Sequence, residues 1–149
     1  MIDAIDRAML RRIQEDGRIT ATALASEVGL TVAPCHRRLK DLETQGVIRG
    51  YSADVDPAKV GLGFEALVFV TLKDRQNMKN FEAELEGIAQ VVEAQRLFGE
   101  PDFLLRVMAA DLTAYQHLYD DVLVGLPGVE KLTSTIVMKN LKSGLRLPL

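Results

Sequence analysis

A short basic segment is the part of this sequence with the clearest chemical potential. Arg37, Arg38 and Lys40 place three cations within four positions. If residues 31–45 wind as a helix, Arg37 and Lys40 share a face with the small residue Ala33, opposite the apolar face. Such a helix suits a DNA major groove, where an arginine can bridge to a guanine edge and other cations can hold phosphates. The alternative is a set of ordinary solvated charges, because two acids in the same helix partly offset the cations.

Side chains suited to other chemistry are scarce. Cys35 is the only cysteine, which excludes an intramolecular disulfide and a cysteine-rich zinc site. It falls on the apolar face of the same helix, which favours a small core residue over a reactive thiol. His36 and His117 have no recognisable nucleophile or metal-ligand partner, and no glycine-rich phosphate loop appears. We therefore expect no enzyme, no cofactor and no metal site.

Three short helices position the basic segment. Apolar residues at every fourth position predict the first helix over about residues 3–15. Thr20 is suited to cap a second helix that ends near residue 28, and Thr31 to cap the third. A glycine and a leucine alone separate the second helix from the cap of the third. This spacing is typical of a helix-turn-helix, with a plain three-helix bundle as the alternative.

The composition changes after the helices. Residues 47–55 are β-rich and suited to a short wing or hairpin, and a proline and two glycines mark residues 53–63 as a linker. We therefore predict a helix-turn-helix domain over residues 1–52 and a second domain over residues 64–149. Residues 1–52 hold 8 basic against 7 acidic side chains, and the rest of the chain holds 10 against 14. This balance excludes nucleic-acid binding by bulk charge and suggests that the two parts have different partners.

The second domain alternates strands and helices in the order βαββαβ. This order is the ferredoxin-like arrangement, so the expected fold class is α+β: a helix-turn-helix domain, winged or plain, followed by a ferredoxin-like domain. The expected elements are strands over residues 64–72, 91–98, 103–109 and 129–138, and helices over residues 77–88 and 111–122.

The first of these strands is apolar on both faces, because Leu67 and Phe69 alternate with Val68 and Val70. Helices cover only one face of such a sheet, and a large apolar patch on the other face marks an interface. We therefore expect a homodimer formed sheet to sheet. Its two-fold symmetry would present two helix-turn-helix units to two DNA half-sites.

Many ordered motifs along the chain follow one known pattern. In the first part they are Ile5-Asp6-Arg7, Leu10, Ile13, Asp16-Gly17-Arg18, Leu24-Ala25, Val28-Gly29-Leu30, Pro34-Cys35, Arg37-Arg38-Leu39, Leu42-Glu43, Gly46-Val47-Ile48-Arg49-Gly50-Tyr51 and Asp56-Pro57. In the second part they are Gly99, Asp102 with Phe103-Leu104-Leu105-Arg106-Val107, Asp111-Leu112-Thr113-Ala114-Tyr115 and Leu126-Pro127-Gly128-Val129. At this spacing the chain resembles the Lrp/AsnC, or feast/famine, family of transcription regulators over essentially its whole length.

The resemblance implies a ligand-sensing ferredoxin-like body, dimers that often assemble into octamers, and amino acids as typical effectors. It also implies double-stranded DNA as the partner of the third helix. The expected function is a sequence-specific transcriptional regulator that responds to an amino acid or a related small molecule. The residues expected to contact DNA are Thr31, Ala33, His36, Arg37, Arg38 and Lys40.

The turn that would sense the effector departs from the family pattern. The usual Gly-Asp-aromatic-Asp reads Gly99-Glu100-Pro101-Asp102 here. Its two carboxylates suit an ammonium group, and the N–H groups around Gly99 together with Arg96 suit a carboxylate. The alternative is a pair of ordinary turn acids, with Asp102 bonding its own backbone. By alignment, the family's cleft between neighbouring dimers also recruits Leu112, Val124, Thr135 and Ile136.

Because the turn is altered, an architectural protein that organises DNA without an effector is the alternative function. No apolar run is long enough to span a membrane, and the N-terminus lacks the apolar core of a signal peptide. We expect a cytoplasmic protein without membrane association.

Overall fold

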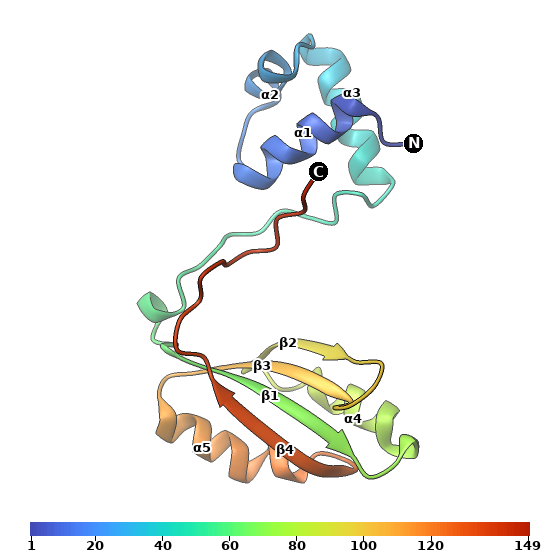
Figure 1. The fold of residues 1–149 in the computed structure, drawn as a ribbon. Coiled ribbons are helices and arrows are strands. Elements are labelled where there is room, and N and C mark those ends of the chain that lie inside the picture. The colour runs from blue at the N-terminus through green and yellow to red at the C-terminus, as the bar shows by residue number, and fades with distance from the viewer. The chain divides into compact units, whose positions relative to one another are not determined.

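A computed structural model describes all 149 residues, and the chain divides into two units. A helical unit comprises residues 1–54 together with residues 142–149, and a sheet unit comprises residues 55–141 (Figure 1). The sequence analysis predicts that the second domain extends to residue 149, whereas the structure groups residues 142–149 with the helices. No helix in the chain has both the length and the apolar character needed to cross a membrane.

The helical unit contains the three expected helices, α1 (Ala4–Glu15), α2 (Ala21–Val28) and α3 (Val32–Thr44). Thr20 caps α2, as expected, and the Asp3 side chain caps α1, which the sequence analysis did not predict. Thr31 holds the cap position of α3, but its hydroxyl makes no capping hydrogen bond. The core of the unit consists of the fully buried residues Met9, Leu24, Ala25 and Cys35.

Residues 47–55 form neither a strand nor a hairpin in the structure. Their polar groups find partners on or beside α3 instead of within the run. The N–H of Ile48 donates to the Leu42 carbonyl oxygen at 3.1 Å, and the Tyr51 hydroxyl donates to the Glu43 carboxylate at 2.8 Å. Burial and the Glu43 contact raise the pKa of Tyr51 to about 12, so this hydroxyl keeps its proton and remains a donor.

The sheet unit confirms the expected βαββαβ order. Its strands and longer helices are β1 (Phe64–Leu72), α4 (Met78–Leu85), β2 (Val91–Arg96), β3 (Phe103–Ala109), α5 (Leu112–Asp121) and β4 (Val129–Ile136). Short 3-10 turns are η1 (Ala58–Val60), η2 (Arg75–Asn77) and η3 (Leu123–Gly125). The strands pair antiparallel in the order β2-β3-β1-β4, and both α4 and α5 lie on one face of the sheet (Figure 1).

Alternation along the two central strands divides the sheet into a covered and an open face. The residues of β1 and β3 that face the helices are buried, among them Val68, Val70 and Leu105. The intervening residues Leu67 and Phe69 are only half-buried. No element of the sheet unit covers the open face, which leaves an apolar centre there.

Candidate DNA interface and ligand site

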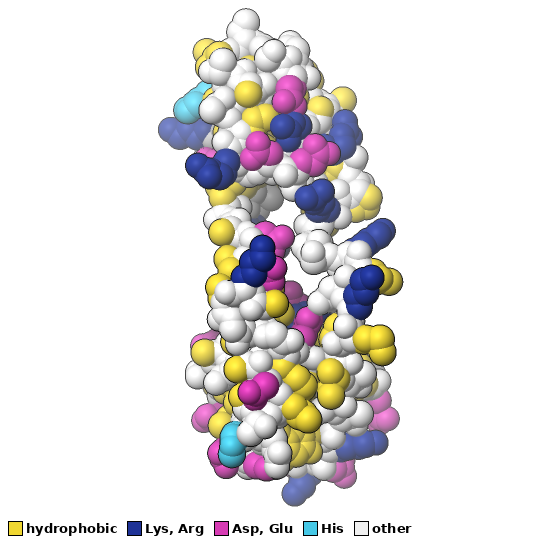
Figure 2. Space-filling model, turned by 90° about the vertical axis from the view of Figure 1, so that its left-hand side faces the viewer, with side chains coloured by type: hydrophobic (Ala, Val, Ile, Leu, Met, Phe, Trp, Pro, Cys, Tyr) yellow, Lys and Arg dark blue, Asp and Glu magenta, His cyan; other side chains and the backbone are white.

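Helix α3 presents most of the expected DNA-contacting residues to solvent. Thr31 and Ala33 are exposed at its beginning, and His36, Arg37 and Lys40 are exposed along its length. Neither Arg37 nor Lys40 makes an ion pair in the structure. Figure 2 shows that the helical unit carries several Lys and Arg side chains on its surface. The exposed face of α3 therefore carries two cations that are free to bind an anion.

Arg38 is the exception among these residues. Its Nη1 atom donates to the carboxylate of Asp3 at 2.7 Å and to that of Asp6 at 2.8 Å. Both acids belong to the capping box of α1, in which each side chain accepts from the other residue's backbone N–H. Arg38 therefore joins α3 to the beginning of α1 through its Nη1 atom.

Replacement of Arg38 by alanine should destabilise the helical unit. The variant leaves Asp6, a mostly buried acid, without its cation, and removes the link between α1 and α3. We expect a Tm lower by several degrees in thermal unfolding followed by circular dichroism, with α1 amides exchanging faster. Arg37→Ala is the matched control, since Arg37 makes no such contact; an equal loss in both variants would contradict the structural role.

The same cluster sets a pH dependence. The backbone N–H of Asp6 and the Arg38 guanidinium lower the pKa of the Asp3 carboxyl below its ordinary value of 3.8. The ionised Asp3 carboxylate therefore stabilises the folded protein at pH values above 3.8, the ordinary pKa of the group. This contribution is lost as the pH falls through the lower pKa that Asp3 has in the folded protein. In acid unfolding between pH 5 and about pH 2, Arg38→Ala should therefore lose less stability than the wild type.

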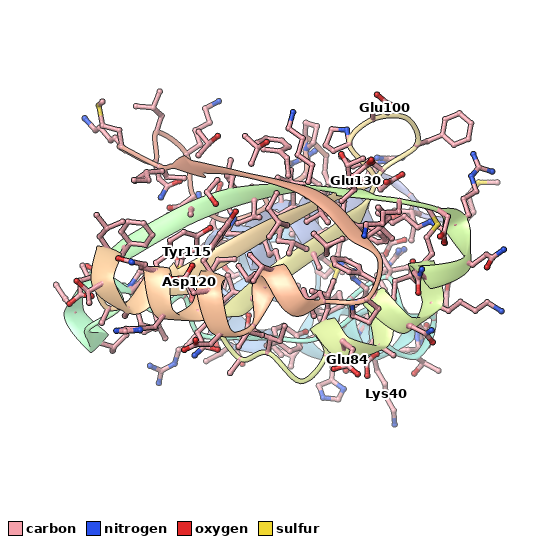
Figure 3. The ribbon with its side chains drawn as sticks, turned by 90° about the horizontal axis from the view of Figure 1, so that it is seen from below. Lys40, Glu84, Glu100, Tyr115, Asp120 and Glu130 are labelled. Atoms are coloured by element: carbon pink, nitrogen blue, oxygen red, sulfur yellow. The ribbon has the colours of Figure 1, made fainter.

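The turn between β2 and β3 brings together three of the expected ligand-binding residues, Gly99, Glu100 and Asp102. Asp102 has a structural task there: its carboxylate accepts from the N–H of Leu72 at 2.8 Å, and its own N–H donates to the Val70 carbonyl oxygen at 2.9 Å. Glu100 is exposed and makes no ion pair or hydrogen bond. Figure 3 shows Glu100 on a turn that projects beyond the sheet. Glu100 is thus the free carboxylate of the turn.

The other expected ligand-binding residues lie away from this turn. In the β1–β4 register Thr135 lies opposite Leu67, and Ile136 follows Thr135. Asp102 instead contacts Leu72, which is five residues beyond Leu67 along β1. Five residues of a strand span about 17 Å, so this distance separates the two places. Leu112 follows the far end of β3, and Val124 lies on η3. All four side chains are exposed. One copy of the chain therefore does not assemble these residues into a single site.

Arg96 is also separated from the turn acids. It lies opposite Phe103 in the β2–β3 register, on the face that α4 covers. There its Nη1 atom pairs with Glu82 of α4 at 3.3 Å. No group of three or more histidine, cysteine or acidic side chains in the structure could hold a metal ion.

Residues 142–149 were not recognised in the sequence as part of the helical unit. Gln14 makes a two-way contact with Leu147, donating to its carbonyl oxygen at 3.2 Å and accepting from its N–H at 2.6 Å. Arg11 donates to the carbonyl oxygen of Leu149 at 2.9 Å. Hydrogen bonds between a side chain and a distant backbone group leave no periodic signal in the sequence. The segment lines one side of a groove of about 1060 Å³ with α1 and residues 47–54.

Deletion of residues 142–149 should loosen the helical unit. The deletion leaves Gln14 and Arg11 without these partners, at a cost of about 1–2 kcal/mol. Hydrogen exchange followed by mass spectrometry should show faster exchange in α1 and unchanged exchange in β1 and β3. Leu145→Ala serves as the control, because this side chain is 82% exposed and should change nothing. Unchanged exchange in α1 would show that the segment does not support the helices.

Comparison with known proteins agrees with this architecture. Residues 2–49 match the family model described as "Winged helix-turn-helix DNA-binding", and residues 65–147 match "Lrp/AsnC ligand binding domain". The chain is 35% identical to the DNA-binding transcriptional activator DecR of Escherichia coli, covering 100% of this chain and 99% of the relative. It is 36% identical to the leucine-responsive regulatory protein of Rhizobium meliloti, covering 98% and 95%.

Solved structures show the same fold. A transcriptional regulator from Neisseria meningitidis in complex with L-Met superimposes with a TM-score of 0.95, at 35% identity, over 99% of this chain and 97% of that one. A feast or famine regulatory protein from M. tuberculosis complexed with L-methionine gives a TM-score of 0.90, at 32% identity, over 99% of both chains. The chain therefore belongs to the Lrp/AsnC family of transcriptional regulators, with a DNA-binding helix-turn-helix domain and a ligand-binding domain.

Proposed function

We propose that this regulator reads operator DNA with α3 and that an amino acid changes its DNA binding or its assembly. The exposed, unpaired cations Arg37 and Lys40 on α3 are the observation that carries the DNA part. Arg37 lies one turn beyond Ala33, whose small side chain lets the helix approach the base edges. We therefore assign Arg37 to a contact with the edge of a guanine base. Lys40 is assigned to a phosphate, and Thr31 and His36 border the same surface.

An amino acid is proposed as the effector because two similar proteins of known structure carry L-methionine. The free carboxylate of Glu100 is suited to the ammonium group, and N–H groups around Gly99 are suited to the carboxylate. Gly99 has a φ of 125°, a conformation that other residues rarely adopt. Within one copy of the chain, the β2–β3 turn lies away from the other expected ligand-binding residues, Leu112, Val124, Thr135 and Ile136. The proposal therefore requires a neighbouring copy to bring its own residues of this set next to the turn.

A homodimer formed through the open face of the sheet is the proposed building block, and octamers of four such dimers would supply the neighbouring copy. Leu67, Phe69 and Leu104 form the half-buried centre of that face, with Phe69 directly opposite Leu104. Obligate interfaces resemble a core cut in half. The rim is polar, since Arg106 pairs there with Glu65 and with Glu93. No catalytic role is proposed, and the DNA partner supports the proposal that the protein acts in the cytoplasm.

Glu100→Ala should abolish the response to the amino acid while leaving DNA affinity without the amino acid unchanged. Glu100 is the sharper test than Asp102, because Asp102→Ala also removes the acceptor for Leu72 N–H. The measurement is DNA binding by fluorescence anisotropy with and without L-methionine and L-leucine, at concentrations up to several millimolar. Thr113→Ala, at an exposed position on α5, is the control. A Glu100→Ala protein that responds as the wild type does would remove the turn from the proposed site.

A further inference from the structure

Two segments of the chain connect the helical unit with the sheet unit (Figure 1). The first follows α3. Its last hydrogen bond in the helical unit is that of the Tyr51 hydroxyl with Glu43, at 2.8 Å, and it enters the sheet unit at Phe64, the first residue of β1. From residue 51 to residue 64 the chain spans at most about 45 Å when fully extended, and less while the turn η1 is intact.

The second connection follows β4 and is shorter. Asn140 is still held in the sheet unit, because its Nδ2 atom donates to the Glu65 carboxylate at 2.7 Å. Leu147 is already held on α1 by its two-way contact with Gln14, at 3.2 and 2.6 Å. Residues 141–146 lie between these two contacts and make no hydrogen bond. From residue 140 to residue 147 the chain spans at most about 25 Å.

Gln14 is the residue that makes this second connection a restraint. It binds the backbone N–H and carbonyl oxygen of Leu147, whose side chain is 55% exposed, so the contact does not depend on burial of that side chain. A unit attached by one flexible segment turns freely about it and reaches as far as the segment allows. A second attachment, at another point of the unit, removes much of that freedom and sets the shorter limit.

We propose that residues 141–149 are a tether that makes the regulator selective for the spacing of its DNA half-sites, with Gln14 as the positioning residue that holds the tether. The inference rests on the proposed function, in which a dimer reads two half-sites. Half-sites on the same side of the duplex are separated by whole helical turns of about 34–36 Å. To reach a half-site one turn further away, each copy must strain the short connection or release Leu147 from Gln14.

Insertion of a flexible Gly/Ser segment of about eight residues between Lys142 and Ser143 tests the tether. The insertion leaves the contacts on α1 in place and lengthens the second connection by up to about 26–29 Å in each copy, so that two copies together gain more than one helical turn. Duplexes carry two selected half-sites at their best spacing or about one turn, 10–11 base pairs, further apart. In fluorescence anisotropy the wild type should bind the wider duplex about tenfold or more weakly, and the insertion variant at most about threefold more weakly.

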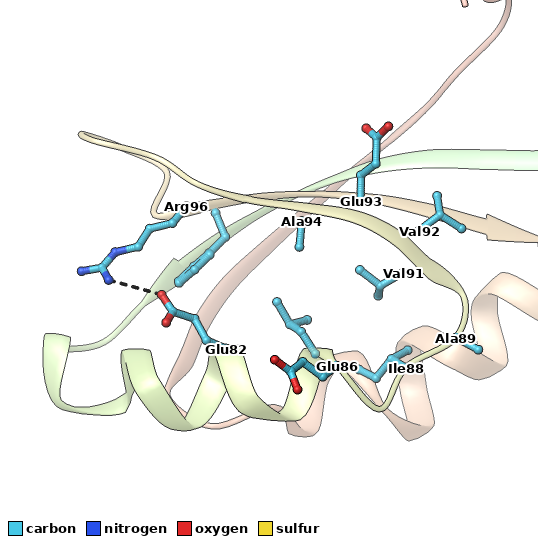
Figure 4. A pocket seen from close by; sticks show the side chains of 11 residues that line it. Glu82, Glu86, Ile88, Ala89, Val91, Val92, Glu93, Ala94 and Arg96 are labelled. Atoms are coloured by element: carbon cyan, nitrogen blue, oxygen red, sulfur yellow. Dashed lines mark hydrogen bonds and ion pairs between the residues drawn. The ribbon is translucent and has the colours of Figure 1, made fainter. Parts of the chain in front are cut away.

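The same segment inserted after Ala89 is the control. Ala89 is exposed on the turn between α4 and β2 (Figure 4), which begins and ends in the sheet unit, so both connections keep their lengths. This variant should discriminate between the two spacings as the wild type does, and circular dichroism checks that both insertion proteins are folded.

Gln14→Ala is a second variant, which frees the tether without lengthening the chain. It should also reduce the loss of affinity on the wider duplex. Gln45→Ala, at an exposed position just after α3 whose side chain makes no hydrogen bond, should not. A merely structural role of Gln14 would weaken binding to both duplexes by the same factor and leave the ratio of the two affinities unchanged.

The outcomes separate the tether from the proposed function. A wider tolerance in the Lys142–Ser143 insertion variant and in Gln14→Ala, with both controls like the wild type, supports the tether. Unchanged discrimination in a folded insertion variant overturns the tether and leaves the reading of two half-sites intact. A wild type that binds both spacings equally, or binds selected and random DNA alike, contradicts the reading of paired half-sites and overturns the tether with it.

Discussion

A Phe69→Glu variant should be monomeric at micromolar concentrations at which we expect the wild type to be at least a dimer. Phe69 lies at the centre of the open sheet face, opposite Leu104 and half-buried even in a single chain. In a two-fold interface each substitution occurs twice. At about 2 kcal/mol for each buried anchor, the loss is about 4 kcal/mol, or roughly a thousandfold in the dissociation constant.

Analytical ultracentrifugation measures this effect directly. Gln116→Glu adds the same charge at an exposed position of α5, on the helical side of the sheet, and should leave the assembly unchanged. Circular dichroism of the Phe69→Glu protein checks that its sheet unit remains folded. A folded Phe69→Glu protein that sediments as the wild type does would place the dimer interface elsewhere.

Arg37→Ala should weaken binding to a selected operator by about 1–3 kcal/mol, roughly five- to 150-fold, and weaken binding to random DNA much less. Arg37 is exposed and unpaired on α3, so its loss should remove the proposed base contact without disturbing the fold. The operator comes from selection in a random-sequence duplex library, and anisotropy titrations give both affinities.

Lys40→Ala is the comparison variant that distinguishes a base contact from a phosphate contact. A lysine on a phosphate contributes equally to all sequences, so this variant should weaken operator and random DNA alike and lower the salt slope by about one. Equal losses on the two DNAs for Arg37→Ala would show that Arg37 is a phosphate contact too.

Local patterns were enough to predict most of the fold. Thr20 acts as a helix cap, as predicted, because a capping side chain bonds to a backbone N–H only three residues away. The βαββαβ order followed from the periodicity of each segment, although β2 ends at Arg96, two residues earlier than expected. Burial raises the pKa of the Cys35 thiol, in agreement with its predicted place in the core.

Contacts between distant residues could not be predicted in the same way. Arg38 looks like any other cation of the basic segment, but its carboxylate partners lie 35 and 32 residues earlier in the chain. The direction of Arg96 depends on one extra residue in β2, and a bulge reverses the alternation beyond it. Residues 47–55 have strand-forming side chains, but a strand also requires a partner, and none is available in the helical unit.

The most direct test of an amino-acid-responsive regulator is a titration of the wild-type protein on its selected operator with each common amino acid in turn. Fluorescence anisotropy gives the DNA affinity, and sedimentation of the same samples gives the assembly state. We expect at least one amino acid to shift the affinity by about fivefold or more, or to change the assembly. Superimposable binding curves and unchanged sedimentation with every amino acid at several millimolar would contradict the account, and would indicate an architectural DNA-organising protein instead.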